Sequence, residues 1–80
     1  SPLFDGEFDV VNQRLVGEKH LKLVLRAPTV GEVDAIAFNV DLAQWPNASH
    51  LRVQLAYRLD VNVFRGNETV QLLVEQITPA

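Results

Sequence analysis

The segment that decides the fold is KHLKLVLR, residues 19–26, in which leucine takes every second place from residue 21 to residue 25. Successive side chains of a β-strand point to opposite faces, so these leucines share one face. The other face is mostly basic and carries His20, Lys22, Val24 and Arg26. The pattern predicts a strand with a leucine side in the core and a basic side in solvent.

Period-two patterns continue on both sides of this segment. Upstream, apolar and acidic residues alternate over residues 4–10, and Gly17-Glu18 provides a turn before residue 19. Downstream, residues 33–40, 51–63 and 70–77 are expected to form strands. The phases of these strands predict a core of Leu21, Leu23, Leu25, Ile36, Phe38, Val53, Leu55, Tyr57, Leu59 and Leu72.

A single helix-like stretch interrupts the strands, at residues 41–45. Asp41 can cap it and Pro46 ends it, which leaves about one turn. Three strands, a short helical turn and two more strands predict an all-β, five-stranded Greek-key OB-fold barrel. A small open sandwich is the alternative, but closure into a barrel removes the exposed edges of so valine-rich a chain.

Composition limits the kinds of protein that the chain can be. Its 80 residues predict one domain, residues 1–80, and the absence of methionine suggests a fragment of a larger multidomain protein. With 48% hydrophobic residues the chain should fold, and without cysteine it has neither disulfides nor thiolate ligands. No membrane-length apolar run or signal peptide is present, which predicts a cytoplasmic location and no membrane contact. The net charge of −3 argues mildly against a free-standing nucleic-acid binder.

Catalytic and metal-binding patterns are weak. Asp5, Glu7 and Asp9 form an acidic stripe that could hold a divalent cation, but a solvated outer face is the better interpretation, since metal sites need oxygens from several segments. Ser49 and His50 are sequence neighbours without an orienting group, so they do not predict a nucleophile and its base. We therefore expect no catalytic residue, metal site or cofactor in this chain.

The basic residues carry the more specific hypothesis. In OB-folds, nucleic acid crosses the face of the second and third strands, between the loop after the first strand and the loop before the last. The residues placed to reach that region are Arg14, Lys19, His20, Lys22, Arg58 and Arg65. Ordinary solubilising charge is the alternative interpretation.

The aromatic residues limit this hypothesis. Single-strand binders stack bases on exposed rings. Phe4, Phe8, Phe38 and Tyr57 fall in inward phases, Trp45 is expected to plug the barrel, and Phe64 alone is expected to point outward. The sequence thus predicts a domain that holds the phosphate backbone, or one that packs on a larger neighbour.

Several segments, taken in order, resemble one family. They are PLFDGEF at residues 2–8, RLVGEKHLKL at 14–23, AIAFN at 35–39, YRLDVN at 57–62, FRG at 64–66 and VQL at 70–72. The ordered set is similar to the C-terminal OB-fold domain of the bacterial RecJ family, the single-strand-specific DNA exonucleases. Glu68-Thr69 departs from the basic residue common in that last loop.

The resemblance implies a function that composition does not. Such enzymes degrade single-stranded DNA from the 5′ end in recombination and repair, using manganese or magnesium held by an Asp-His-His motif in other domains. The motif is absent here, so this chain is expected to be a non-catalytic domain that holds single-stranded DNA. The alternative is a protein-interaction module that docks on the catalytic core or on a single-strand-binding protein.

Overall fold

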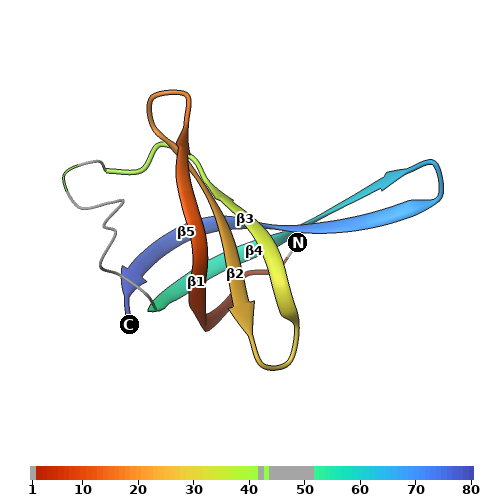
Figure 1. Ribbon diagram of the computed structural model, residues 1–80, viewed down its shortest axis with the longest axis horizontal. Coiled ribbons are helices and arrows are strands. Elements are labelled where there is room, and N and C mark those ends of the chain that lie inside the picture. The colour runs from red at the N-terminus through yellow and green to blue at the C-terminus, as the bar shows by residue number, and fades with distance from the viewer. Residues whose placement is uncertain (1, 42, 44–51) are drawn as a thin grey trace.

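The computed structural model describes residues 2–41, 43 and 52–80 and contains five β-strands (Figure 1). The strands are β1 (Phe4–Val16), β2 (His20–Ala27), β3 (Gly31–Ala37), β4 (Arg52–Phe64) and β5 (Asn67–Pro79). They close into a barrel in the order β1-β2-β3-β5-β4. The predicted all-β, five-stranded OB-fold barrel is thereby confirmed.

The first strand closes the barrel because it pairs with two neighbours. Its first half is antiparallel to β4 and its second half is antiparallel to β2, with a bulge between Val10 and Asn12 where the strand passes from one partner to the other. The third strand pairs in parallel with β5. No helix is found in the described part of the chain, and so none there could span a membrane. The helical turn expected at residues 41–45 lies mostly outside the described residues, as do Trp45, Ser49 and His50.

The barrel interior confirms most of the predicted core. Among the described residues, nine apolar side chains are buried: Phe8, Leu21, Leu23, Leu25, Ala35, Ala37, Val53, Leu55 and Leu72. Leu21, Leu25 and Val53 have no exposed surface at all. Tyr57 packs against this cluster without being fully buried. The alternation of apolar residues along β2 and the first half of β4 therefore gave the correct inward faces.

The predicted phase of β3 is wrong. Ala35 and Ala37 point inward, whereas Ile36 is only half-buried and Phe38 is 58% exposed. The cause is the register with β2, which sets Ala35 opposite Leu23 and Ala37 opposite Leu21. Small side chains opposite large ones suit the narrow interior of a small barrel. The strand also ends at Ala37 rather than at residue 40.

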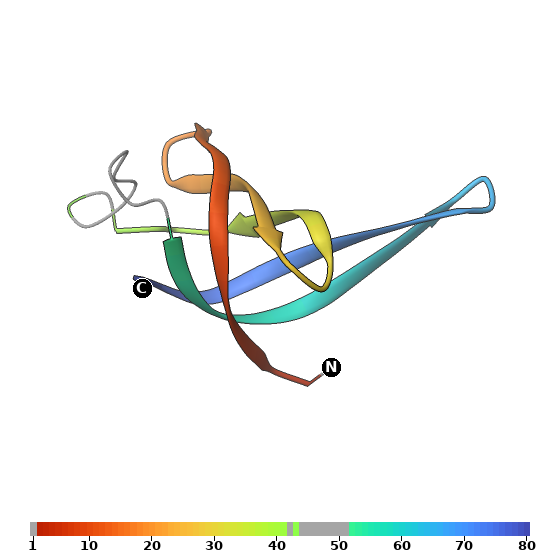
Figure 2. The same ribbon diagram turned by 60° about the horizontal axis from the view of Figure 1, so that its bottom comes forward.

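The other correction concerns the outer half of the β4–β5 hairpin. Leu59, expected in the core, is 42% exposed, and Val61, expected to face inward, is 50% exposed. These strands run past the barrel as a two-stranded arm, which projects from its side (Figures 1 and 2). Residues 61–70 are all exposed, because no third strand or helix covers them in the described part of the chain.

Candidate nucleic-acid interface

The centre of the candidate interface is a pair of cations on the outer face of β1 and β2. Arg14 lies directly opposite Lys22 in the antiparallel register, and Leu23, next along β2, points into the core. Like charges in directly opposite positions of a sheet destabilise the pair. An anion bound between the two side chains would remove this repulsion, so the pair is a candidate phosphate contact.

Lys19 and His20 lie next to this pair, at the β1–β2 turn. The Lys19 carbonyl accepts a hydrogen bond of 2.8 Å from the Val40 N–H, which ties the turn to the segment after β3. His20 Nδ1 accepts a hydrogen bond of 3.2 Å from the Asn39 N–H, and its ring contacts Phe38 edge to face. His20 therefore positions the end of β3, and its Nδ1 is not available to a ligand.

The structure separates the other two predicted cations from this cluster. Arg58 Nε donates a hydrogen bond of 2.9 Å to Glu75 on β5, so the charge of Arg58 is shared with a carboxylate. Cross-strand neighbours place two apolar residues, Ile36 and Leu73, between Lys22 and Arg58. Arg65 lies in the turn at the end of the arm, with its guanidinium 5.2 Å from the centre of the Phe64 ring. The structure thus groups Arg14, Lys19, His20 and Lys22.

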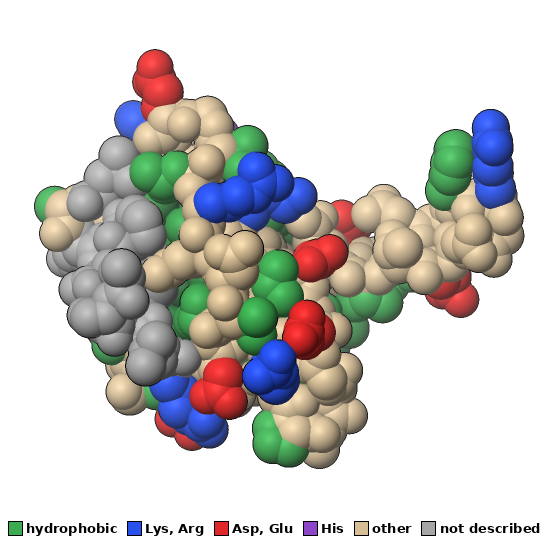
Figure 3. Space-filling view, viewed as in Figure 1, with side chains coloured by type: hydrophobic (Ala, Val, Ile, Leu, Met, Phe, Trp, Pro, Cys, Tyr) green, Lys and Arg blue, Asp and Glu red, His purple; other side chains and the backbone are tan. Residues whose placement is uncertain are grey.

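Acidic residues border the basic cluster on the side of the β2–β3 turn. Asp34 on β3 and Asp60 on β4 both pair with Gln71 of β5. Asp34 also pairs with Val24, which is two residues after Lys22 on β2, so the two carboxylates belong to the next row of outward-facing side chains. Figure 3 shows a group of basic side chains over the upper part of the barrel, with an acidic side chain at the tip above it, and acidic and basic side chains mixed over the lower part. A phosphate backbone would therefore follow the half nearer the β1–β2 turn.

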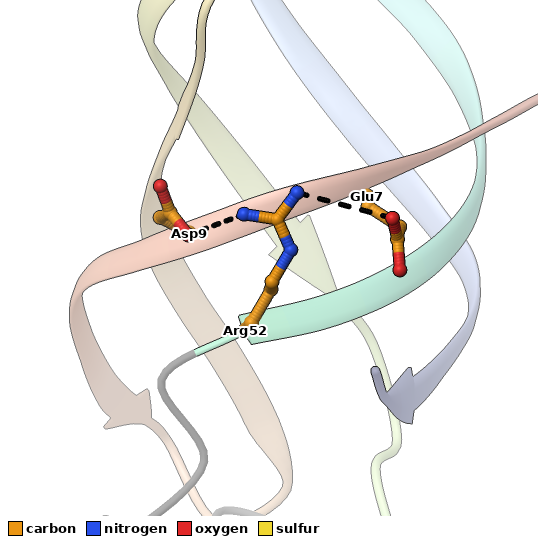
Figure 4. Close-up of polar contacts among 3 residues, drawn as sticks. All are labelled: Glu7, Asp9 and Arg52. Atoms are coloured by element: carbon orange, nitrogen blue, oxygen red, sulfur yellow. Dashed lines mark hydrogen bonds and ion pairs between the residues drawn. The ribbon is translucent and has the colours of Figure 1, made fainter.

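The acidic stripe of β1 is partly neutralised by β4. Arg52 lies between two of its carboxylates, 2.9 Å from an oxygen of Asp9 and 3.8 Å from one of Glu7 (Figure 4). Among the residues that the structure describes, no three His, Asp or Glu side chains converge in a way that could hold a metal ion. The Glu7 and Asp9 carboxylates are about half exposed, so this part of the stripe lies at the surface of the barrel.

Exposed aromatic rings are the part of this surface that sequence reasoning missed. Three of the four phenylalanines are exposed: Phe4 (40%), Phe38 (58%) and Phe64 (71%). Phe4 stacks on Tyr57 and Phe64 faces Arg65, whereas Phe38 meets His20 at an interplanar angle of 74°. The expectation that Phe64 alone points outward was therefore wrong. Pairing the alanines of AIA, residues 35–37, with the leucines of β2 would have revealed the outward phase of Phe38.

An apolar groove lies on another part of the barrel from the basic cluster. Its volume is about 710 Å³, and it is formed by the start of β1, the β2–β3 hairpin and the base of the arm. Apolar residues that line it include Phe4, Val30, Leu59 and Val70, all of them exposed, and Glu32 and Asp34 lie at the groove as well. An apolar groove with acidic residues suits a protein partner better than it suits a phosphate backbone.

The comparisons with known proteins agree with this architecture. The family model described as the RecJ OB domain matches residues 1–76. Over 79 residues the chain is 52% identical to the single-stranded-DNA-specific exonuclease RecJ of Escherichia coli (strain K12) and 53% identical to that of Dickeya dadantii (strain 3937). The protein of the same name from Haemophilus influenzae (strain ATCC 51907 / DSM 11121 / KW20 / Rd) is 46% identical over 81 residues.

Each of these matches covers 98% of this chain and 14% of the relative. The chain thus spans about one seventh of the length of the curated relatives that it matches. The family match covers nearly the whole chain, and the closed five-stranded barrel has the strand order of an OB-fold. On these grounds, this chain belongs to the RecJ OB-domain family.

Proposed function

We propose that this chain is a non-catalytic domain that holds single-stranded DNA for a 5′-to-3′ exonuclease acting in recombination and repair. The observation that carries the proposal is the Arg14–Lys22 pair, with Lys19 at the adjoining turn, on the β2 side of the barrel. OB-folds bind oligonucleotides on this face. The names of the relatives, single-stranded-DNA-specific exonucleases, support the same function.

The catalytic step is assigned to other domains of the parent protein. We propose that those domains hold manganese or magnesium, and that this 80-residue chain binds no cofactor and forms a single domain. The parent is proposed to act in the cytoplasm, without membrane contact. In this arrangement the barrel guides the strand by contacts with its phosphates, which are independent of base sequence.

Binding of a labelled single-stranded oligonucleotide, followed by fluorescence anisotropy at low salt, tests the proposal. The double variant Arg14→Ala/Lys22→Ala should bind much more weakly than the unsubstituted chain. Arg26→Ala/Arg52→Ala is the matched control, because it also removes two positive charges, but from ion pairs with Glu32 and Asp9. Equal losses in the control and the double variant would show that net charge, and not the Arg14–Lys22 pair, determines binding.

The apolar groove favours a second candidate function, a protein-interaction module. Its volume of about 710 Å³ and its exposed apolar residues suit docking on the catalytic core or on a single-strand-binding protein. Absence of DNA binding even at low salt, together with binding to the remainder of the parent protein supplied separately, would favour this second function over the first.

A further inference from the structure

Phe38 occupies a fixed position at the edge of the basic cluster. It follows directly after Ala37, which is paired with Leu21 of β2, and the next residue, Asn39, has a left-handed φ of 55°. The Asn39 N–H bonds to His20 and the Val40 N–H bonds to the Lys19 carbonyl, so the chain after Phe38 is attached to the β1–β2 turn. Phe38 is nevertheless 58% exposed. An exposed ring held this firmly costs little conformational entropy when a ligand binds to it.

His20 leaves at least one face of the Phe38 ring uncovered. The ring centroids of Phe38 and His20 are 5.1 Å apart at an interplanar angle of 74°, so the contact uses the edge of one ring and at most one face of the other. The other exposed phenylalanines differ. Phe4 stacks nearly parallel on Tyr57, and a face of Phe64 lies under the Arg65 guanidinium.

The surroundings of Phe38 suit a nucleotide in a defined orientation. On one side lie the β1–β2 turn with Lys19 and, farther along β2, the Lys22–Arg14 pair. On the other side a groove of about 210 Å³ runs between residues 37–41 and 74–79.

The carboxylates of this groove already have partners. Glu75 pairs with Arg58 at 2.9 Å, and an oxygen of Asp41 accepts a hydrogen bond of 3.0 Å from the Ala43 N–H. Their charge is therefore less repulsive to a neighbouring nucleotide than two bare carboxylates would be. Phosphates would lie on the lysine side of Phe38, and the base would lie against the ring and the groove.

We infer that Phe38 is a stacking platform for one base of single-stranded DNA, and that His20 positions its ring. This inference rests on the proposed function and adds a contact with a base to a site otherwise made of contacts with phosphates. Stacking is tolerant of base identity, because every base has a π-face. The domain would then hold DNA more tightly than cations alone allow, without reading its sequence.

The test compares Phe38→Ala, Phe38→Tyr and the unsubstituted 80-residue chain in oligonucleotide binding over a range of salt concentrations. Loss of one stacked base should weaken binding about 5- to 150-fold in Phe38→Ala, and Phe38→Tyr should restore it. Because phenylalanine has no charge, the slope of log affinity against log salt should not change. An oligonucleotide with abasic sites throughout should bind Phe38→Ala and the unsubstituted chain equally.

Leu3→Ala is the matched control, since Leu3 is similarly exposed, at 55%, and lies away from the cluster at the start of the chain. Its affinity should equal that of the unsubstituted chain. A flatter salt slope in Phe38→Ala would mean that the ring only positions the cations, and would overturn the inference. Unchanged affinity in Phe38→Ala, with normal binding by the unsubstituted chain, would overturn the inference and leave the proposed function intact. No binding by the unsubstituted chain would overturn both.

Discussion

Substitution of Lys22 is expected to weaken DNA binding without lowering the stability of the fold. Lys22 lies opposite Arg14, so Lys22→Ala removes a repulsion across the sheet and should leave the free energy of unfolding unchanged or raise it by up to about 1 kcal/mol. The same change should weaken binding to all single-stranded sequences alike and flatten the salt slope by about 0.7, the contribution of one phosphate contact. Salt titrations and thermal unfolding of the same variant measure both effects. Unchanged affinity and slope would place the DNA path elsewhere on the barrel.

Leu23 is the residue that tests the register of the barrel. It is 2% exposed and faces Ala35 on β3, so Leu23→Ala should leave a cavity in the interior. The expected loss is about 2–5 kcal/mol, a large part of the 5–15 kcal/mol typical of whole domains. Urea unfolding measures this loss. A value below about 1 kcal/mol would place Leu23 at the surface.

At the scale of the elements, the turn of the arm combines local strain with a cation. Arg65 and Gly66 have φ values of 52° and 80°, and Phe64 pairs with Asn67, which is the arrangement of a two-residue type I′ hairpin turn. Asn is preferred at the first central position of such a turn, whereas a left-handed conformation costs most residues roughly 1–2 kcal/mol.

Arg65→Asn should therefore stabilise the arm, and the same variant tests whether Arg65, which lies apart from the Arg14–Lys22 pair, takes part in DNA binding. Relief of the strain should increase the hydrogen-exchange protection of the amides at the end of the arm, because the hairpin opens less often. If Arg65 contacts a phosphate, the loss of its charge should lower DNA affinity and flatten the salt slope by about 0.7. Arg65→Lys is the matched control, since it keeps both the charge and the unfavourable backbone position. Greater protection with unchanged affinity would remove Arg65 from the interface.

At the scale of the whole molecule, the expected behaviour is weak, salt-sensitive binding without cleavage. Three phosphate contacts should give a slope of log affinity against log salt near roughly −2. Purified chain incubated with single-stranded DNA and manganese should leave the DNA intact, because the residues that the structure describes provide no converging set of metal ligands. Gel analysis of the DNA measures this. Digestion that requires the protein and stops with a chelator would contradict the prediction.

Local alternation along the chain determined most of the barrel. The leucines of β2 and the pair Val53 and Leu55 of β4 are separated by two positions, so one face of each strand was fixed before any neighbour was known. The order of strands and turns then restricted the topology to a five-stranded barrel or a small sandwich. The cations of β2, Lys22 and Arg26, could be placed on the outer face by the same argument, because they alternate with the core leucines.

Tertiary structure decided the features that depend on a partner strand. The segment AIAF, residues 35–38, is apolar throughout, so its inward phase followed only from the pairing of Ala35 and Ala37 with the leucines of β2. The pairing of Arg58 with Glu75 depends on the irregular register of β4 and β5, and the exposure of Val61 depends on where the barrel ends along those strands. Alternation is a property of one strand, whereas register, closure and ion pairing are properties of two or more. For that reason the sequence by itself determined the strands and the basic face of β2, whereas the closure of the barrel and the exposed ring of Phe38 emerged only from the assembled sheet.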